Sequence, residues 1–277
     1  YTVPFTKHFI PTENYLKERE GAIRNYREKL WETIHRGSYP ELYSNTDKEW
    51  VDFYQSYVKT YLERDVNKLI KAKNHLTFVK FLTCVAARTG QVVNYSNISS
   101  EIGVSEVTVK DWISILEKSG LIYILKPYTS SALSRAIKTP KIYFRDTGLC
   151  CYLTRWLTPD TLFETFVINE ILKSYSNEGL EYDFNVFYYN GKDKKKRKEN
   201  GEEIEVDGEI DLILQEDGIL YPIEIKMSAT PKADMASEFD VLDGIPDKKR
   251  GMGTIICLYD RKMYLRENLV ALPLEYI

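Results

Sequence analysis

The sequence is poor in the residues that build zinc sites, disulfide frameworks and membrane spans. Its 277 residues include three histidines and four cysteines, and no two cysteines have the CxxC spacing of zinc sites. This composition argues against a structural zinc ion and fits a reducing cytoplasm, where we expect the protein to work. No apolar run approaches the roughly 18–20 residues of a membrane span, and no signal peptide is recognisable, so no membrane partner is expected.

Motifs for nucleotide hydrolysis and nucleophilic catalysis are also missing. The pair Gly191-Lys192 lacks the first glycine of a P-loop and is followed by Asp193, so these residues cannot carry ATP hydrolysis. No Gly-x-Ser-x-Gly occurs, which leaves a serine hydrolase poorly supported. The net charge is only −3, so nucleic-acid binding would need a local basic patch.

Apolar and aromatic residues are abundant enough for a packed core, and the chain divides into three parts. Residues 1–70 are predicted to form a helical segment, with Thr12 as an N-cap and interruptions at Gly37 and Pro40. After the second interruption, apolar and aromatic side chains recur at spacings of three and four, which predicts one buried helix face. That face comprises Trp50, Phe53, Tyr54, Tyr57, Tyr61 and Val66.

Residues 71–150 have the pattern of a winged helix-turn-helix. A helix over 76–89 precedes a short helix opened by Asn94 or Ser96, and Gly103 and Ser105 provide a turn and a cap for a third helix that stops at Gly120. The segments "LIYILKPY" and "KIYFRD" are predicted as the two strands of the wing, and the residues between them as the wing loop.

In such a fold the third helix would enter the major groove of DNA. Its exposed candidates are Glu106, Thr108, Lys110, Asp111 and Ser114. Two acids beside one lysine make a poor phosphate-binding surface, which favours an interaction or spacer unit. The wing residues Arg135, Lys138 and Lys141 favour direct DNA contact instead, and the sequence leaves both alternatives open.

Residues 151–277 predict an α/β domain (α+β for the chain as a whole). The amphipathic helix 161–179 directs Phe163, Phe166, Val167, Ile171 and Leu172 toward the core. Strands are predicted at "FNVFYYN", "GEIDLILQEDG", "ILYPIEIKM" and "GTIICLYD", with a helix around "KADMASEFDVLD" between the last two. This order implies a mixed sheet flanked by helices.

Two carboxylates and an ammonium group are predicted to share one face of two of these strands. Alternation along a strand points Glu224 and Lys226 the same way, with Ile223 and Ile225 on the opposite, core side. The turn over 215–218 brings Asp211 alongside them. The alternative is a solvated strand face with a cross-strand ion pair.

This cluster has the chemistry of metal-assisted phosphodiester hydrolysis. Carboxylates suit Mg²⁺ or Mn²⁺, and the carbonyl of Ile225 could complete the ligand set. A metal ion activates water and neutralises charge on the phosphate, while Lys226 can orient or help deprotonate that water.

A basic run lies between the first two predicted strands of this domain. It comprises Lys192, Lys194, Lys195, Lys196, Arg197 and Lys198. As a hairpin loop it could clamp backbone phosphates beside the metal site. It could equally be a solvated loop neutralised by the acidic run 199–209, and the sequence does not decide between the two.

Asp211 followed by Glu224-Ile225-Lys226 resembles the Asp…Glu-X-Lys signature of the PD-(D/E)XK nuclease superfamily. In its Holliday-junction-resolvase-like branch a further Glu comes from the preceding helix. Glu164 is the matching position here, and Glu170 on the same helix ranks second. The resemblance implies a restriction-endonuclease-like sheet and a magnesium-dependent nuclease site at these residues.

Six blocks in order, from "LWETIHRGSYPELY" to "PIEIK", also resemble the C-terminal region shared by many prokaryotic AAA-type ATPases. That resemblance implies a preceding ATPase domain as partner, and ATP as a ligand only through that domain, which we expect to be absent from this chain because it has no P-loop. The first residue, Tyr1 rather than Met, leads us to expect a longer protein. The expected nucleic acid is DNA, and the oligomeric state is not indicated. The alternative function is an inactive nuclease fold and winged helix that tether the ATPase to DNA or protein.

Overall fold

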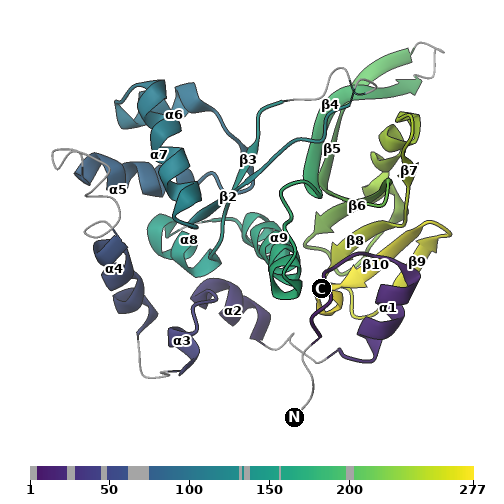
Figure 1. The fold of residues 1–277 in the computed structure, drawn as a ribbon, viewed down its shortest axis with the longest axis horizontal. Coiled ribbons are helices and arrows are strands. Elements are labelled where there is room, and N and C mark those ends of the chain that lie inside the picture. The colour runs from purple at the N-terminus through teal and green to yellow at the C-terminus, as the bar shows by residue number, and fades with distance from the viewer. Residues whose placement is uncertain are drawn as a thin grey trace. The chain divides into compact units, whose positions relative to one another are not determined.

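The computed structural model describes residues 5–23, 29–44, 49–61, 75–130, 133, 138–155, 157–197 and 203–277. Two compact units share the chain (Figure 1). Unit 1 contains residues 1–26, 125–139 and 167–277, and unit 2 contains residues 27–124 and 140–166. The chain therefore passes between the units after residues 26, 124, 139 and 166. The predicted boundaries near residues 70 and 150 stay predictions.

Unit 2 begins with three short helices, α2 (Leu30–Arg36), α3 (Glu41–Ser44) and α4 (Trp50–Tyr61). In α4 the side chains of Phe53, Tyr54 and Tyr61 are buried. Trp50 and Tyr57 are only partly buried and pack against the same core, so the predicted core face is confirmed in part. Val66, the last residue of that predicted face, lies outside the described residues. The continuous helix expected from Thr12 onward is wrong, because α1 (Glu13–Glu20) ends at Gly21.

The predicted winged helix-turn-helix arrangement is present in unit 2. It consists of α5 (His75–Ala86), α6 (Tyr95–Ile102) and α7 (Glu106–Lys118), with β1 (Gln91–Val92), β2 (Ile122–Leu125) and β3 (Lys141–Phe144) in the sheet order β1-β3-β2. Asn94 caps α6 by accepting the Asn97 amide at 2.9 Å, and Ser105 caps α7. Gly103 between them has φ +77°, the left-handed conformation that ends a helix.

A buried carboxylate ties α8 (Thr147–Thr154) to the helices before it. Asp146 caps α8 by accepting the Leu149 amide at 2.6 Å. The same carboxylate accepts the Ser38 amide at 2.7 Å and the Tyr54 hydroxyl at 2.6 Å. Gly148 approaches this network so closely that a Cβ there would lie 2.3 Å from the Tyr54 hydroxyl oxygen.

Unit 1 is built on a seven-stranded mixed sheet (Figure 1). The strands are β4 (Val186–Arg197), β5 (Glu203–Glu216), β6 (Ile219–Lys226), β7 (Lys249–Arg250), β8 (Gly253–Cys257), β9 (Met263–Arg266) and β10 (Leu269–Pro273). Their order is β4-β5-β6-β8-β10-β9, with β7 paired to β6. The pairs β4–β5, β5–β6 and β9–β10 are antiparallel, whereas β6, β8 and β10 run parallel. The mixed α/β class is therefore confirmed, although β7, β9 and β10 were not predicted.

Helix α9 (Pro159–Glu178) precedes the sheet, and all five of its predicted core residues are buried. The helix expected between β6 and β8 is instead two 3₁₀ segments, η4 (Ala233–Ala236) and η5 (Phe239–Gly244). Their buried residues Ala236, Phe239 and Leu242 recur at every third position. This period matches a 3₁₀ helix, in which residues i and i+3 eclipse, rather than an α-helix.

The basic run forms part of a strand and not of a loop, which corrects the prediction. Residues 192–197 continue β4 and pair antiparallel with the acidic segment of β5, in the register Lys194↔Val206 to Arg197↔Glu203. The paired hairpin thus extends past the last β5–β6 pair, Leu212↔Ile223 (Figure 1). The β-branched residues Ile204 and Val206 in the acidic segment favour the extended conformation of a strand.

The segment between the two wing strands belongs to unit 1. There the Tyr128 amide donates to the Tyr188 carbonyl at 2.6 Å, and the Tyr188 amide donates to the Lys126 carbonyl at 3.1 Å. Residues 126–128 thus add to the outer edge of β4. The sequence predicted residues 126–128 as the end of the first wing strand, but β2 ends at Leu125, so that prediction is wrong for these three residues.

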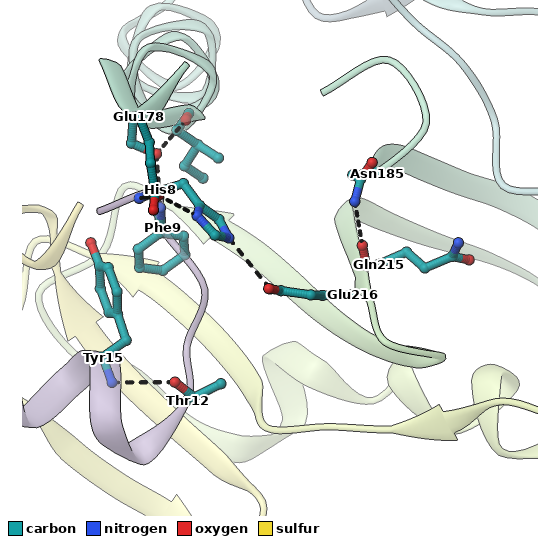
Figure 2. A network of polar contacts seen from close by, with 10 residues as sticks. His8, Phe9, Thr12, Tyr15, Glu178, Asn185, Gln215 and Glu216 are labelled. Carbon is teal, nitrogen blue, oxygen red and sulfur yellow. Dashed lines mark hydrogen bonds and ion pairs between the residues drawn. The ribbon is translucent and has the colours of Figure 1, made fainter. Parts of the chain in front are cut away.

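An N-terminal strap, residues 5–21, ties together distant parts of unit 1. The His8 ring contacts Glu178 at 2.6 Å and Glu216 at 3.4 Å, and so links the ends of α9 and β5 (Figure 2). The Tyr15 hydroxyl donates to the Tyr276 carbonyl at 3.0 Å. Thr12 caps α1 as predicted, because its hydroxyl accepts the Tyr15 amide (Figure 2).

Candidate metal centre

An irregularity in β5 places Asp211. Phe187 of β4 pairs with Ile213, but Tyr189 pairs with Ile210, so two residues of β5, Asp211 and Leu212, oppose one residue of β4. Such bulges redirect side chains and are frequent beside active sites. The ladder between β5 and β6 ends at the same point, with Leu212↔Ile223 as its last pair.

Strand β6 supplies the other two groups by alternation. Glu224 and Lys226 point to one face, and Ile223 and Ile225 are buried on the other, as predicted. Residues of neighbouring strands that pair in register share a face. The partners Ile255 and Cys257 of β8 therefore lie on the face of Glu224 and Lys226.

Apolar packing on that face removes the carboxylates from water. Ile255 and Cys257 belong to a buried cluster that also contains Phe239 and Leu242 of η5. The side chains of Asp211 and Glu224 are each 10% exposed, whereas that of Lys226 is 42% exposed. The two carboxylates are thus shielded from water, whereas the ammonium group of Lys226 is partly exposed to it.

Lys226 lies within ion-pair distance of both carboxylates and in direct contact with that of Glu224. Lys226 Nζ lies 2.5 Å from Glu224 Oε1 and 4.0 Å from Asp211 Oδ2. Asp211 Oδ2 also accepts the backbone amide of Ile225 at 2.8 Å, in place of a ladder bond between the strands. The turn at Asp217-Gly218, where both residues have positive φ, sets the register that allows this meeting.

Burial and the nearby negative charge of Asp211 both change the pKa of Glu224. Burial raises the pKa of its carboxyl group, the negative charge of Asp211 raises it further, and Lys226 offsets only part of this, so that the pKa rises to about 8. Glu209, two residues before Asp211, adds to the same effect. Sequence reasoning missed Glu209, although the alternation Glu-x-Asp along β5 was a visible signal.

The donor set suits a hard divalent cation. In an extended strand the N–H and C=O groups of one residue point to the same edge, so the Ile225 carbonyl points to the side on which its amide meets Asp211. Two carboxylates, one carbonyl and water are ligands of the kind that Mg²⁺ takes, because it keeps several waters and accepts phosphate oxygens. Among the described residues, no group of three or more His, Cys, Asp or Glu side chains could hold a metal ion.

Glu164, the predicted third carboxylate, lies in unit 2. Its Oε1 accepts the Tyr143 hydroxyl at 2.6 Å and lies 3.8 Å from Lys141 Nζ. Glu170, the second choice, contacts Lys173 one turn along α9 at 2.5 Å. The role of Glu164 at the metal stays a prediction.

The residues predicted to bind nucleic acid have varied surroundings. Lys141 is buried beside Glu164, so it does not belong to an exposed phosphate-binding surface. Lys110 of α7 lies over the Tyr95 ring, 5.3 Å from its centroid. Lys138 and Lys192 are exposed. Arg135 and Lys198, and the side chains of residues 194–197, lie outside the described residues.

Two family models cover almost the whole chain beyond the strap. Residues 27–160 match a domain of unknown function, DUF8612, and residues 160–277 match a second domain of unknown function, DUF4143. The chain joins two domains of unknown function. Asp211, Glu224 and Lys226 all lie in the DUF4143 match, and the winged helix lies in the DUF8612 match.

The curated relatives are themselves uncharacterised. Proteins Rv2008c of Mycobacterium tuberculosis and Mb2031c of Mycobacterium bovis are each 22% identical to this chain over 262 residues. The alignment covers 90% of this chain and 53% of each relative, so the chain spans about half the length of the relatives it matches. The crystal structure of protein VC1899 from Vibrio cholerae is 14% identical, with a TM-score of 0.27, over 81% of this chain and 51% of that one. Every helix in the described part of the chain is too short or too polar to cross a membrane.

Proposed function

We propose that the DUF4143 region binds Mg²⁺ or Mn²⁺ at Asp211 and Glu224 and hydrolyses phosphodiester bonds of nucleic acid. One observation carries this proposal: two carboxylates buried in an apolar cluster converge on the same lysine, although their mutual repulsion makes that arrangement costly. Natural proteins retain such destabilising pairs mainly where function needs them. The resemblance of Asp211 and Glu224-Ile225-Lys226 to the PD-(D/E)XK signature supports the same chemistry.

In this proposal the chain's residues divide the work of hydrolysis. Asp211, Glu224 and the Ile225 carbonyl would hold the cation, which when bound would supply an activated water and positive charge beside the phosphate. Lys226, which is partly exposed, orients the attacking water and stabilises the charge that develops on the phosphate oxygens. Water adds to phosphorus and loses a proton to solvent, and the bond from phosphorus to the leaving oxygen breaks as that oxygen takes up a proton from solvent.

DNA is the substrate that we propose, and the extended β4–β5 hairpin is its candidate contact. The hairpin begins in the same strand as Asp211, and the basic run follows its β4 side. The recognition helix α7 is a weaker candidate, since its surface combines Glu106, Asp111 and Glu117 with only Lys110 and Lys118. In a longer protein we propose an AAA-type ATPase domain as the partner of this region.

A second function deserves a test because the described residues contain no larger group of metal ligands. In this alternative the nuclease-like fold is inactive, and the two regions tether the ATPase to DNA or to another protein. Pairing of residues 126–128 with β4 favours it, since that part of the wing serves packing within unit 1.

Cleavage assays with matched variants distinguish the two functions. Linear, branched and single-stranded DNA are incubated with the purified chain and Mn²⁺, beside Asp211→Asn and beside Lys249→Met, which removes an exposed charge from β7 of the same sheet. We expect cleavage by the parent and by Lys249→Met, and a loss of at least a hundredfold in Asp211→Asn. Metal binding without cleavage of any substrate would favour tethering, and absence of metal binding would refute the metal site.

A further inference from the structure

We infer that Lys226 is an internal counter-ion, which holds Asp211 and Glu224 together in the metal-free protein and must leave before a divalent cation can bind. The inference rests on the proposed metal site but concerns a separate property, the competition between a side chain and the metal for the same oxygens. It assigns Lys226 a role in metal affinity that does not depend on substrate.

The positions of the three groups carry the argument. Lys226 Nζ is within ion-pair distance of both carboxylates, 2.5 Å from Glu224 Oε1 and 4.0 Å from Asp211 Oδ2. Mg²⁺ bound by both carboxylates would lie about 2.0–2.1 Å from an oxygen of each. An ammonium group and a cation cannot share the space between two carboxylates, because they overlap there and repel each other. Binding of the metal therefore requires Lys226 to move.

Of the three side chains, only that of Lys226 has surroundings that allow it to move. The Asp211 carboxylate is fixed, since it accepts the Ile225 amide at 2.8 Å and is buried beside the bulge of β5. Glu224 is buried on β6, where it pairs with Ile255 of β8. The Lys226 side chain is 42% exposed, so its flexible stem can turn toward solvent without opening the core.

Charge explains why a divalent cation would displace the ammonium group of Lys226 from the two carboxylates. When both carboxylates are ionised, one ammonium group leaves the cluster with a net negative charge, whereas a divalent cation balances both carboxylates. Once displaced, the ammonium group is exposed to solvent, where an incoming anionic substrate would meet it. The same side chain thus protects the metal-free fold and becomes available for substrate only after the metal is bound.

Metal affinity and thermal stability of Lys226→Met test the inference without any assay of cleavage. Mn²⁺ binding is measured from the signal of the free ion in electron paramagnetic resonance, beside Lys226→Arg and Lys249→Met as controls. We expect Lys226→Met to bind Mn²⁺ at least threefold more tightly than the parent and to melt at a lower temperature without metal. Saturating Mn²⁺ should remove most of that difference in melting temperature. Both controls should bind Mn²⁺ as the parent does.

The outcomes separate this inference from the proposed function. If the parent binds Mn²⁺ and Asp211→Asn does not, the metal site stands; unchanged or weaker binding by Lys226→Met would then overturn the counter-ion role alone. If the parent binds no Mn²⁺, both proposals fail. An unchanged melting temperature of metal-free Lys226→Met would also contradict the counter-ion role.

Discussion

Replacement of Glu224 by glutamine should stabilise the metal-free protein, by an amount that grows with pH. In the folded protein, burial and the charge of Asp211 raise the pKa of Glu224 from 4.5 to about 8. In the unfolded chain these causes disappear. Between pH 4.5 and pH 8 the folded state therefore binds more protons at this group than the unfolded state does, so stability falls as the pH rises.

The size of the effect follows from the same pKa values. A difference of one in pKa corresponds to about 1.4 kcal/mol, so the rise from 4.5 to about 8 corresponds to about 5 kcal/mol at alkaline pH. Glutamine keeps the shape of the side chain but cannot ionise. We expect the free energy of unfolding of Glu224→Gln, relative to the parent, to increase by about 1 kcal/mol per pH unit between pH 5 and pH 8.

Urea unfolding at several pH values in EDTA measures this difference, because the other titrating groups are common to both proteins. Glu178→Gln is the matched control: hydrogen bonds from the His8 backbone and ring lower the pKa of Glu178, so its replacement should give no gain that grows with pH. With saturating Mg²⁺ the advantage of Glu224→Gln should vanish, because only the parent gains from binding. A difference independent of pH, or a less stable glutamine variant at pH 8, would refute the electrostatic argument.

Two further predictions concern the Asp146 network. Asp146→Ala should destabilise the fold by about 3–5 kcal/mol, because the Ser38 and Leu149 amides and the Tyr54 hydroxyl all lose their acceptor; Tyr54→Phe, which removes one donor, should cost about 1.5–3 kcal/mol. Equal losses in urea unfolding would contradict this account. Gly148→Ala should cost about 3 kcal/mol or more, since its Cβ would lie 2.3 Å from the Tyr54 hydroxyl oxygen and 2.4 Å from the Arg36 carbonyl oxygen. Gly244→Ala, which would meet nothing within 4 Å, is its control, and similar melting temperatures for the two variants would count against the crowding at Gly148.

Local patterns in the sequence were enough to predict much of this protein. Caps at Thr12, Asn94 and Ser105 are confirmed, because a side-chain oxygen three residues before a free amide needs no distant partner. The sharing of one face by Glu224 and Lys226 is also confirmed, since alternation is a property of any strand. The spacing of three and four residues along a helix is equally local, so most of the buried residues of α4 and α9 could be predicted where the structure describes them.

Other features depend on contacts between segments far apart in the chain, and only the tertiary structure decided them. Residues 194–197 of the basic run belong to a strand because they pair with residues 203–206 of β5. Residues 126–128 pair with the edge of β4. No local pattern in the sequence predicted either pairing. The bulge at Asp211 and the close contact of Lys226 with two carboxylates likewise arise from register between strands. The sequence alone thus predicted the residues that we propose to hold a metal, whereas packing determined their burial, their repulsion and the contact of Glu224 with the Lys226 ammonium group.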